Sequence, residues 1–316
     1  MNVFPYHNFP NSIMVQTTSR CNAACVFCPY PAVSKETRHG DMSFTLFAKL
    51  MRECGRYPEL KSANMFLMNE PLMDPQIVAR VNFAKDNNPR AAVNLWSNGC
   101  NLTAALARDL INSRLDAMGI SIHAMWPETY RQLTGRGDFE RVLRRVTRFV
   151  KLRNSMRPDL RVDIRLVGVR QFLSPDEVDE AVEYWNQYGI SGVESLLGHV
   201  NRAGNLPGTY QVLHRKICGC GDRMPYHMAA VLYTGDVVLC CMDWRQEQVL
   251  GNIKEQSLAS IWRGDRRREA MAQIQGADSP ADFLCKRCEE SIESKEGKMT
   301  PAGPEHIFAS SSERES

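Results

Sequence analysis

Residues 21–28 read CNAACVFC and directly follow an apolar run, Ile13–Thr17, that we predict to be a β-strand. This stretch places three thiols, Cys21, Cys25 and Cys28, on the loop between the strand and the next helix. Three thiolates can bind three irons of a [4Fe–4S] cubane and leave the fourth iron open. Because an open metal position is typical of a catalytic site, the sequence predicts a reactive iron–sulfur centre on this loop.

Two other interpretations of the three thiols stay open at this point. Structural zinc normally has four Cys or His ligands, and His7 or His39 could supply the fourth. The thiols could also be unligated.

The composition agrees with metal ligation and limits the function classes. Eleven cysteines are many for a chain whose start, Met1–Pro5, lacks the layout of a secretion signal. We therefore expect a cytoplasmic protein, where disulfides are rare. No apolar run has the ~20 residues of a membrane helix. The net charge of +3 does not favour nucleic acid or membrane partners, and the basic stretch Arg263–Arg268 is interpreted as a solvated helix end.

Apolar, β-rich runs alternate with segments of helical period over residues 12–197, which is typical of a parallel sheet wrapped by helices. Two helix starts are clear: Thr103, and the capping box that begins at Ser174 and includes Glu177. Six βα units predict an α/β fold, a partial (β/α)6 TIM-like barrel, with active groups on the loops after the strands. The predicted strands are Ile13–Thr17, Ala63–Met68, Ala92–Ser97, Ala117–Ile122, Val162–Val169 and Gly192–Leu197.

The pattern changes near residue 200, so we expect a barrel domain over residues 1–200 and a small C-terminal iron–sulfur module over 201–290. The module has short strands, a glycine turn at Thr234–Asp236, and a helix over about Leu258–Gln275. Residues 291–316 contain few apolar anchors and are predicted to be a disordered tail.

The cysteine loop at the end of the first strand resembles that of the radical S-adenosylmethionine (SAM) superfamily. The resemblance covers about residues 12–290 and implies that Cys21, Cys25 and Cys28 hold a [4Fe–4S] cluster whose open iron binds the amino and carboxylate groups of SAM. In such enzymes an electron breaks a sulfur–carbon bond of SAM, and the resulting 5′-deoxyadenosyl radical removes hydrogen from the substrate. The resemblance implies that Phe27 packs near the adenine.

Further matches follow the next strands. Met68–Leu72 reads MNEPL and is similar to the family's Gly-Gly-Glu-Pro-Leu, so Glu70 is the expected partner of the methionyl ammonium, although both glycines are replaced. The stretches Trp96–Gly99 and Ser121–His123 also resemble elements of the family. They imply that Ser97, Asn98 and Ser121 lie beside the ribose and carboxylate of SAM. His123 is either a substrate contact or a hydrogen-bonded histidine at the barrel rim.

The C-terminal cysteines resemble the shortened auxiliary-cluster domain called SPASM or twitch. The resemblance implies one further [4Fe–4S] cluster, held by Cys220, Cys240, Cys285 and Cys288. Structural zinc on the same thiols stays open, because four-cysteine zinc sites use similar pairs. The neighbours Cys218 and Cys241 could exchange roles with Cys220 and Cys240.

Two reactions follow from the two clusters. If the auxiliary cluster accepts an electron, a secondary alcohol becomes a ketone; if a thiol such as Cys241 returns hydrogen to the opposite face, the centre is inverted. Residues 201–204 read NRAG and resemble a stretch of aminocyclitol dehydrogenases, which gives Arg202 as the substrate contact unless it bonds loop carbonyls. Cys54 is interpreted as a core residue and Cys100 as a minor thiol candidate at the rim.

The expected partners are a polar, sugar- or aminocyclitol-like small molecule and an external one-electron reductant such as flavodoxin or ferredoxin. A peptide-modifying enzyme is a further alternative, less favoured because only twelve residues precede the first strand. A non-catalytic iron–sulfur protein is the third alternative, and the trio of N-terminal thiols argues against it.

Overall fold

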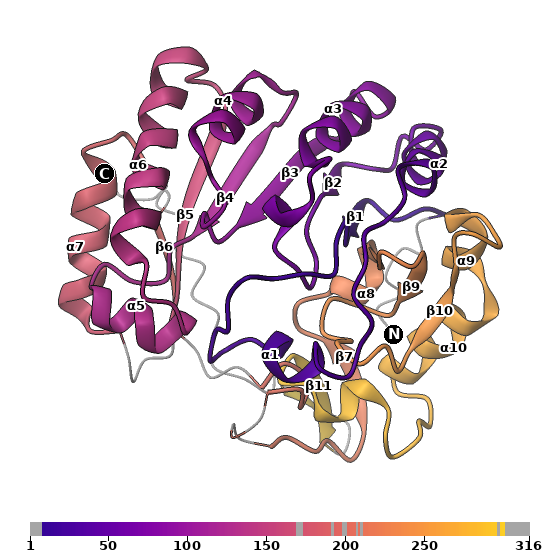
Figure 1. The fold of residues 1–316 in the computed structure, drawn as a ribbon. Helices are drawn as coiled ribbons and strands as arrows, with labels where there is room; N and C mark the ends of the chain where they lie inside the picture. Colours follow the sequence, from indigo (N-terminus) through magenta and orange to yellow (C-terminus); the bar gives the residue numbers. More distant parts are fainter. Residues whose placement is uncertain are drawn as a thin grey trace, which may run out of the picture.

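The computed structural model describes residues 8–168, 173–190, 193–197, 201–206, 208, 211–295 and 298–300. Its main feature is a nine-stranded sheet in the order β10-β9-β8-β1-β2-β3-β4-β5-β6 (Figure 1). The strands from β1 to β6 are parallel neighbours, which confirms the predicted array of six βα units. They are β1 Ser12–Val15, β2 Ser62–Asn64, β3 Ala92–Ser97, β4 Ala117–Ser121, β5 Arg161–Gly168 and β6 Val193–Leu197.

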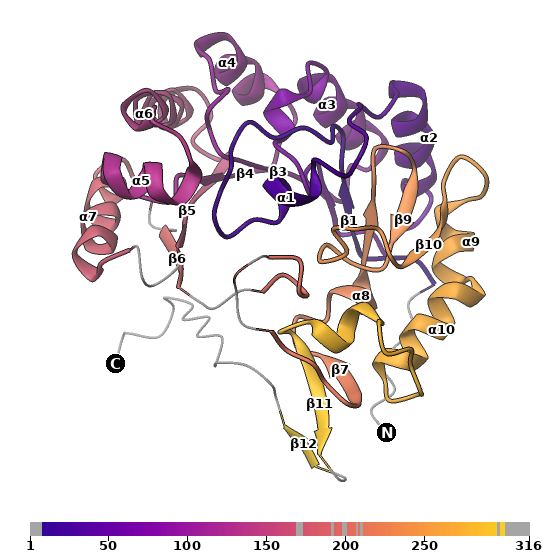
Figure 2. The same ribbon diagram turned by 60° about the horizontal axis from the view of Figure 1, so that its bottom comes forward.

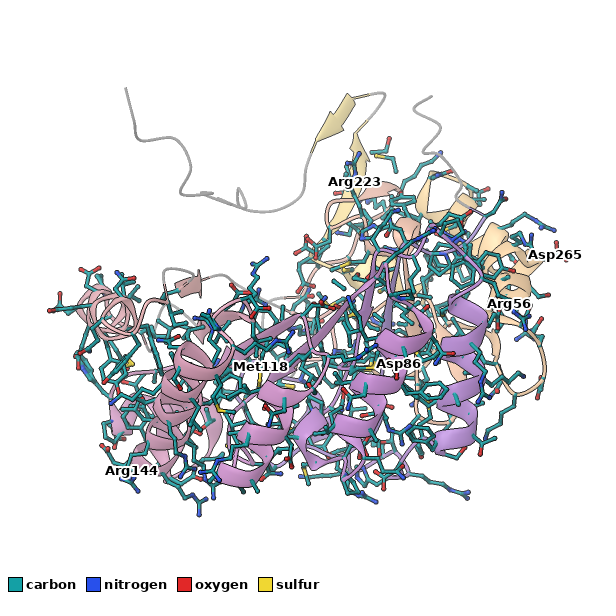
Figure 3. All side chains as sticks on the ribbon, turned by 90° about the horizontal axis from the view of Figure 1, so that it is seen from above. Arg56, Asp86, Met118, Arg144, Arg223 and Asp265 are labelled. Carbon is teal, nitrogen blue, oxygen red and sulfur yellow. The ribbon has the colours of Figure 1, made fainter. Side chains whose placement is uncertain are left out.

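Helices follow the strands and cover the outer face of this sheet (Figures 1 and 2). Their apolar sides pack on the strands, while charged side chains such as Arg144 and Asp86 point outward and Met118 is buried between the layers (Figure 3). No helix in the described part of the chain is long and apolar enough to cross a membrane. The helices are α2 Phe44–Cys54, α3 Ile77–Asn87, α4 Ala104–Asn112, α5 Pro127–Thr134, α6 Phe139–Met156 and α7 Pro175–Asn186.

Both predicted helix starts are capped as expected, but Glu177 does not complete the predicted capping box. The hydroxyls of Thr103 and Ser174 accept hydrogen bonds from the third following amide. Glu177 does not return a bond to Ser174; its carboxylate accepts from the amides of Met125 and Trp126 at 2.8 and 2.9 Å. The buried carboxylate therefore joins α7 to the start of α5, because the neighbouring loop offers two unpaired donors.

Part of the C-terminal region, which the sequence predicts to be a small module, also extends the barrel sheet. Strand β8 (Met228–Val231) pairs in parallel with β1, and β9 (Asp236–Val238) and β10 (Val249–Asn252) continue the sheet in antiparallel pairs. All four residues of β8 are buried, so it covers the edge of β1 that would otherwise be open to solvent. The predicted turn at Thr234–Asp236 joins β8 and β9, with Gly235 at φ +96°.

A second, three-stranded sheet carries part of the C-terminal cysteines. It consists of β7 (Ile217–Cys220), β11 (Ser291–Lys295) and β12 (Lys298–Thr300). The sequence predicts disorder from residue 291, but residues 291–295 form β11, in which Ile292 pairs with Gly219 of β7. Residues 301–316 lie outside the described residues.

Short helices complete the fold. The predicted helix over Leu258–Gln275 is broken in two by Gly264, whose backbone is extended. Figure 2 shows α1 and the loop before it inside the arc formed by the strands. The remaining elements are α1 Tyr30–Val33, α8 Met224–His227, α9 Leu258–Arg263, α10 Asp265–Ile274 and the 3-10 turns η1 Pro71–Met73 and η2 Leu284–Arg287.

Candidate active site between two cysteine clusters

The loop after β1 is fastened to the end of α5. The amides of Ala24 and Val26 donate to the carbonyls of Thr134 and Leu133 at 3.0 and 2.9 Å. The amide of Cys21 donates to the Tyr30 hydroxyl at 2.8 Å. Backbone bonds on both sides of the loop therefore fix the three thiols relative to the sheet.

Asn22 connects this loop to polar groups at the ends of other elements. Its side-chain oxygen accepts from Asn98 at 2.7 Å, and its carbonyl accepts from the Arg136 guanidinium. Arg136 is held in turn by Asp138, with contacts of 2.9 and 2.6 Å. Hydrogen bonds from this arginine lower the pKa of Asp138 to about 2, so the pair is ionised at neutral pH. Sequence reasoning missed Asn22, Arg136 and Asp138, because no motif predicts which loop an arginine will reach.

The three N-terminal thiols form no disulfide and are half-buried. Burial raises the pKa of Cys21 to about 12, with a further contribution from the charge of Glu70, and burial also raises the pKa of Cys25 and Cys28. Buried thiols stay protonated unless positive charge is bound beside them, and iron provides that charge. The donor set of three thiols on one loop therefore fits ligation of three irons, with Cys21, Cys25 and Cys28 as the candidate ligands.

Glu70 lies after β2 and gathers donors from β3. Its Oε1 accepts from the Ser97 hydroxyl at 2.7 Å and the Leu72 amide at 3.0 Å, and its Oε2 accepts from the Asn98 amide at 2.8 Å. Burial raises its pKa while these bonds oppose the rise. A carboxylate has about four acceptor positions, so one remains. The motif residues Glu70, Ser97 and Asn98 thus meet in space, with one acceptor position of the carboxylate unused.

Ser121 and Phe27 have protein partners in the structure. The Ser121 hydroxyl accepts from the Trp96 indole at 2.6 Å. Phe27 is buried and packs edge-on against His123, with 4.8 Å between ring centroids. His123 has a left-handed backbone, φ +67°. The roles of Ser121 and Phe27 toward SAM remain predictions.

An aromatic–cation pair lines the inner side of the strands, and the sequence did not reveal it. The guanidinium of Arg165 on β5 lies 3.9 Å from the ring centroid of Trp96 on β3. Gly119 on the intervening β4 makes room, because a Cβ there would lie 2.3 Å from the indole. Only the sheet register brings these three residues together.

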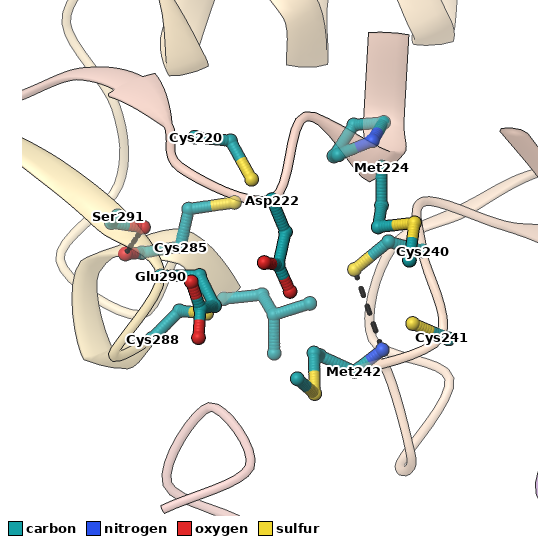
Figure 4. Close-up of a pocket in the computed structure, with 12 residues that line it drawn as sticks. Cys220, Asp222, Met224, Cys240, Cys241, Met242, Cys285, Cys288, Glu290 and Ser291 are labelled. Carbon is teal, nitrogen blue, oxygen red and sulfur yellow. Dashed lines mark hydrogen bonds between the residues drawn. The ribbon is translucent and has the colours of Figure 1, made fainter. Parts of the chain in front are cut away.

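The C-terminal cysteines meet around one cavity (Figure 4). Its empty space is about 390 Å³, part of it open to solvent, and its lining includes the four expected ligands and Cys241 but not Cys218. Within the described ranges, no three His, Cys, Asp or Glu side chains converge on a point that could hold a single metal ion. The expected ligands surround a space instead; they are Cys220, Cys240, Cys285 and Cys288.

Cys240 and its neighbour Cys241 differ in the charges that act on their thiols. The charges that act on the pKa of Cys240 are those of Cys241, Cys285 and Cys288, whereas the pKa of Cys241 responds to Arg202, Asp222 and Glu290. Burial raises the pKa of Cys241 to about 11, and Arg202 opposes the rise. Arg202 also lowers the pKa of Cys28 against the effect of burial. The charge of Arg202 therefore acts on one thiol of the first set and on Cys241 beside the second.

The buried thiols outside these sets have other surroundings. Cys54 is fully buried in the core, as predicted. Cys100, the minor candidate at the rim, is also buried, with its sulfur 3.7 Å from the Tyr130 hydroxyl. Burial raises its pKa to about 11.

Known proteins resemble the chain over nearly its whole length. It is 25% identical over 285 residues to the S-adenosyl-L-methionine-dependent 2-deoxy-scyllo-inosamine dehydrogenase of Niallia circulans, which covers 90% of this chain and 95% of that protein. The crystal structure of BtrN in complex with AdoMet and 2-DOIA has a TM-score of 0.61 at 22% identity, covering 91% and 96% of the two chains. SuiB of Streptococcus suis, solved bound to S-adenosylmethionine, has a TM-score of 0.64 at 14% identity, covering 89% and 73%.

Two family models match, and together they cover about two thirds of the chain. Residues 15–157 match the radical SAM superfamily, and residues 218–289 match SPASM, an iron–sulfur cluster-binding domain. The first match includes the loop of three thiols and Glu70; the second includes all four cysteines expected at the auxiliary site. The chain is an enzyme of the radical SAM superfamily with a SPASM domain, and its cofactors are SAM and two [4Fe–4S] clusters.

Proposed function

We propose that this enzyme oxidises a secondary alcohol of a sugar- or aminocyclitol-like molecule to a ketone. The observation that carries the proposal is the loop of Arg202, which is bonded to the carbonyl of Met242 through Asn205 at 3.1 Å and leaves the buried Arg202 Nε without a partner among the described residues. The charge of Arg202 also lowers the pKa of Cys28 and of Cys241 against the effect of burial. A substrate held by this guanidinium would lie near Cys28, a proposed ligand of the first cluster, and near Cys241, beside the proposed auxiliary cluster. The likeness to a 2-deoxy-scyllo-inosamine dehydrogenase over 95% of that protein supports the same reaction class.

The chemistry needs both cofactors and balances as a two-electron oxidation. When bound, SAM and the first cluster supply the radical that takes a hydrogen atom from the carbinol carbon, and the auxiliary cluster accepts one electron. The hydroxyl proton leaves to a base or to solvent. The external one-electron reductant, such as flavodoxin or ferredoxin, supplies the electron that SAM cleavage consumes.

The protein contributes binding and orientation. Cys21, Cys25 and Cys28 are the proposed ligands of the first cluster, and Cys220, Cys240, Cys285 and Cys288 those of the auxiliary cluster. Glu70 binds the methionyl ammonium, with Ser97 and Asn98 holding its carboxylate. Phe27 and Ser121 contribute to the SAM pocket. Arg202 binds the substrate hydroxyl through charge-assisted hydrogen bonds.

Epimerisation is the second candidate, because one thiol is left over beside the auxiliary site. Cys241 lines the same cavity as the four proposed ligands. A thiol there could return a hydrogen atom to the substrate radical. The sulfur radical would then need one electron and one proton from the external reductant and solvent.

A cytoplasmic, reducing location is part of the proposal, and the lack of disulfides among the eleven described cysteines is compatible with it.

Turnover in deuterated water with aminocyclitols and aminoglycosides tests the two candidates. Dehydrogenation predicts one ketone per 5′-deoxyadenosine and no solvent deuterium at the oxidised carbon. Solvent deuterium at an inverted carbon would reject dehydrogenation in favour of epimerisation. A Cys241→Ala variant is then the matched test: a dehydrogenase keeps its rate, whereas an epimerase that uses this thiol loses it.

A further inference from the structure

The backbone around Arg202 is unusual in a way that the sequence does not show. Arg202, Ala203 and Gly204 all have positive φ values, +52°, +53° and +72°. Two of these residues carry a Cβ, for which the left-handed region is costly. Three successive residues of this kind persist only where surrounding contacts hold them.

One carboxylate holds this loop. Glu289 Oε1 accepts from the amides of Asn201 and Arg202 at 3.1 and 2.9 Å, and Oε2 accepts from the amide of Ala203 at 3.0 Å. Glu289 is largely buried, with 9% of its surface exposed. Charge-assisted bonds to consecutive amides in a concave turn are strong, so this carboxylate offsets the backbone cost.

Other contacts tie the same loop to both cysteine-bearing segments of the auxiliary site. Asn205 Nδ2 donates to the carbonyl of Met242, the residue after Cys241, at 3.1 Å. Arg287 Nε donates to the carbonyl of Ala203 at 3.0 Å. Arg287 passes so close that a Cβ on Gly204 would lie 3.0 Å from its Cδ.

The side chain of Arg202 keeps one hydrogen-bond donor that no described residue uses. Its Nε is buried and has no hydrogen-bond partner in the part of the chain that the structure describes. The loop is therefore bonded through its backbone, while this guanidinium nitrogen remains available to a ligand.

We infer that Glu289 is a positioning residue: it fixes the backbone of Arg202 and couples it to Cys288, the residue immediately before Glu289. The substrate-binding guanidinium and the auxiliary cluster are then held at one relative position. This inference rests on the proposed function, because it gives Arg202 a substrate to bind.

The test compares Glu289→Gln with Glu289→Asp and with Glu293→Gln as the matched control. Glu293 lies on β11 in the same module; it accepts an amide bond from Arg215 and lies 3.7 Å from His214 Nδ1, but it forms no hydrogen bond with the described residues of the Arg202 loop. We expect Glu289→Gln to raise the KM for the substrate or lower ketone formation by about tenfold. SAM cleavage, iron content and the electron paramagnetic resonance spectrum should stay unchanged. Glu289→Asp should recover part of the loss, and Glu293→Gln should match the wild type.

A double-mutant cycle separates positioning from a general structural role. If Glu289 acts through Arg202, Glu289→Gln should cost nothing further in an Arg202→Ala background. Additive losses, wild-type behaviour of Glu289→Gln, or loss of four irons in that variant would each overturn the inference.

Hydrogen–deuterium exchange gives a readout that does not depend on turnover. The amides of residues 201–203 should exchange faster in Glu289→Gln than in the wild type or Glu293→Gln. If the wild type forms no ketone from any alcohol, the proposed function fails, but faster exchange in Glu289→Gln would still support the role of Glu289 in holding the loop. Unchanged exchange would refute that role even in an active dehydrogenase.

Discussion

The carboxylate of Glu70, after β2, accepts a hydrogen bond from the hydroxyl of Ser97, at the end of β3, with 2.7 Å between the two oxygens. Neighbouring parallel strands end at the same edge of the sheet, so their loops bring these distant residues together. The buried charge is held by hydrogen bonds and has one acceptor position left.

Replacing Glu70 by Gln should weaken SAM binding by roughly 10- to 100-fold, because a charge-assisted contact to the ammonium is lost. Ser97→Ala should have a smaller effect in the same direction, since it removes one of three donors to the carboxylate. The measurement is 5′-deoxyadenosine formation against SAM concentration. Equal SAM affinity in Glu70→Gln and the wild type would contradict the assignment.

Single Cys→Ala replacements should divide the cysteines into two groups by iron content. The reconstituted wild type should hold about eight irons, and loss of any auxiliary ligand should leave about four. We expect this loss of iron when any of the four proposed auxiliary ligands is replaced: Cys220, Cys240, Cys285 or Cys288. Replacement of Cys218 or Cys241 should leave the iron content unchanged. A Cys218→Ala variant with half the iron, beside a Cys220→Ala variant with all of it, would reverse the ligand assignment.

The Arg136–Asp138 pair predicts a pH dependence of stability. The folded-state pKa of Asp138 is lowered to about 2, so its contribution is fully present above the ordinary pKa near 4 and is lost as the pH falls toward 2. Asp138→Asn should lower the free energy of unfolding by about 2 kcal/mol at neutral pH, and the difference should shrink below about pH 4.

Urea unfolding followed by tryptophan fluorescence from about pH 7 to about pH 3 measures this difference. Asp86→Asn is the control, because Asp86 forms an exposed ion pair with Arg114 and should change stability by less than about 1 kcal/mol. A constant difference across the whole range would show that the Asp138 charge is not responsible.

Gly119→Ala should disturb the inner face of the sheet. The added methyl would overlap the Trp96 indole, which would have to leave Arg165 and Ser121. We expect a loss of about 1–3 kcal/mol in stability and a changed near-ultraviolet circular dichroism spectrum. Gly137→Ala, where nothing lies within 4 Å of the new Cβ, should leave both unchanged. Similar spectra for the two variants would argue against the packing described.

Much of the fold can be predicted from the sequence because its signals are local. The alternating pattern of Ala92–Ser97 gives β3 with its observed ends, and the thiol loop after Ile13–Thr17 indicates the cluster site. Glu70, Ser97 and Asn98 follow from motifs at strand ends. Their mutual hydrogen bonds then result from the sheet topology.

The missed features depend on contacts between distant segments. The local sequence of Met228–Val231 does not predict that this strand pairs with β1. The sequence around Glu177 does not predict that its carboxylate binds amides before α5 rather than the cap of its own helix. Glu289 is a similar case. Its three bonds exist only because residues 202–204 adopt a left-handed backbone, which their side chains do not encode.

The pairing of β8 with β1 has a consequence for how the protein is made. Every residue of the first thiol loop leaves the ribosome long before Met228, so the nascent barrel has an unpaired edge at β1 until the later segment arrives. Exposed edges of this kind invite association between chains. An N-terminal fragment that ends before β8 should therefore aggregate. We expect no SAM cleavage from a protein shortened to the six βα units.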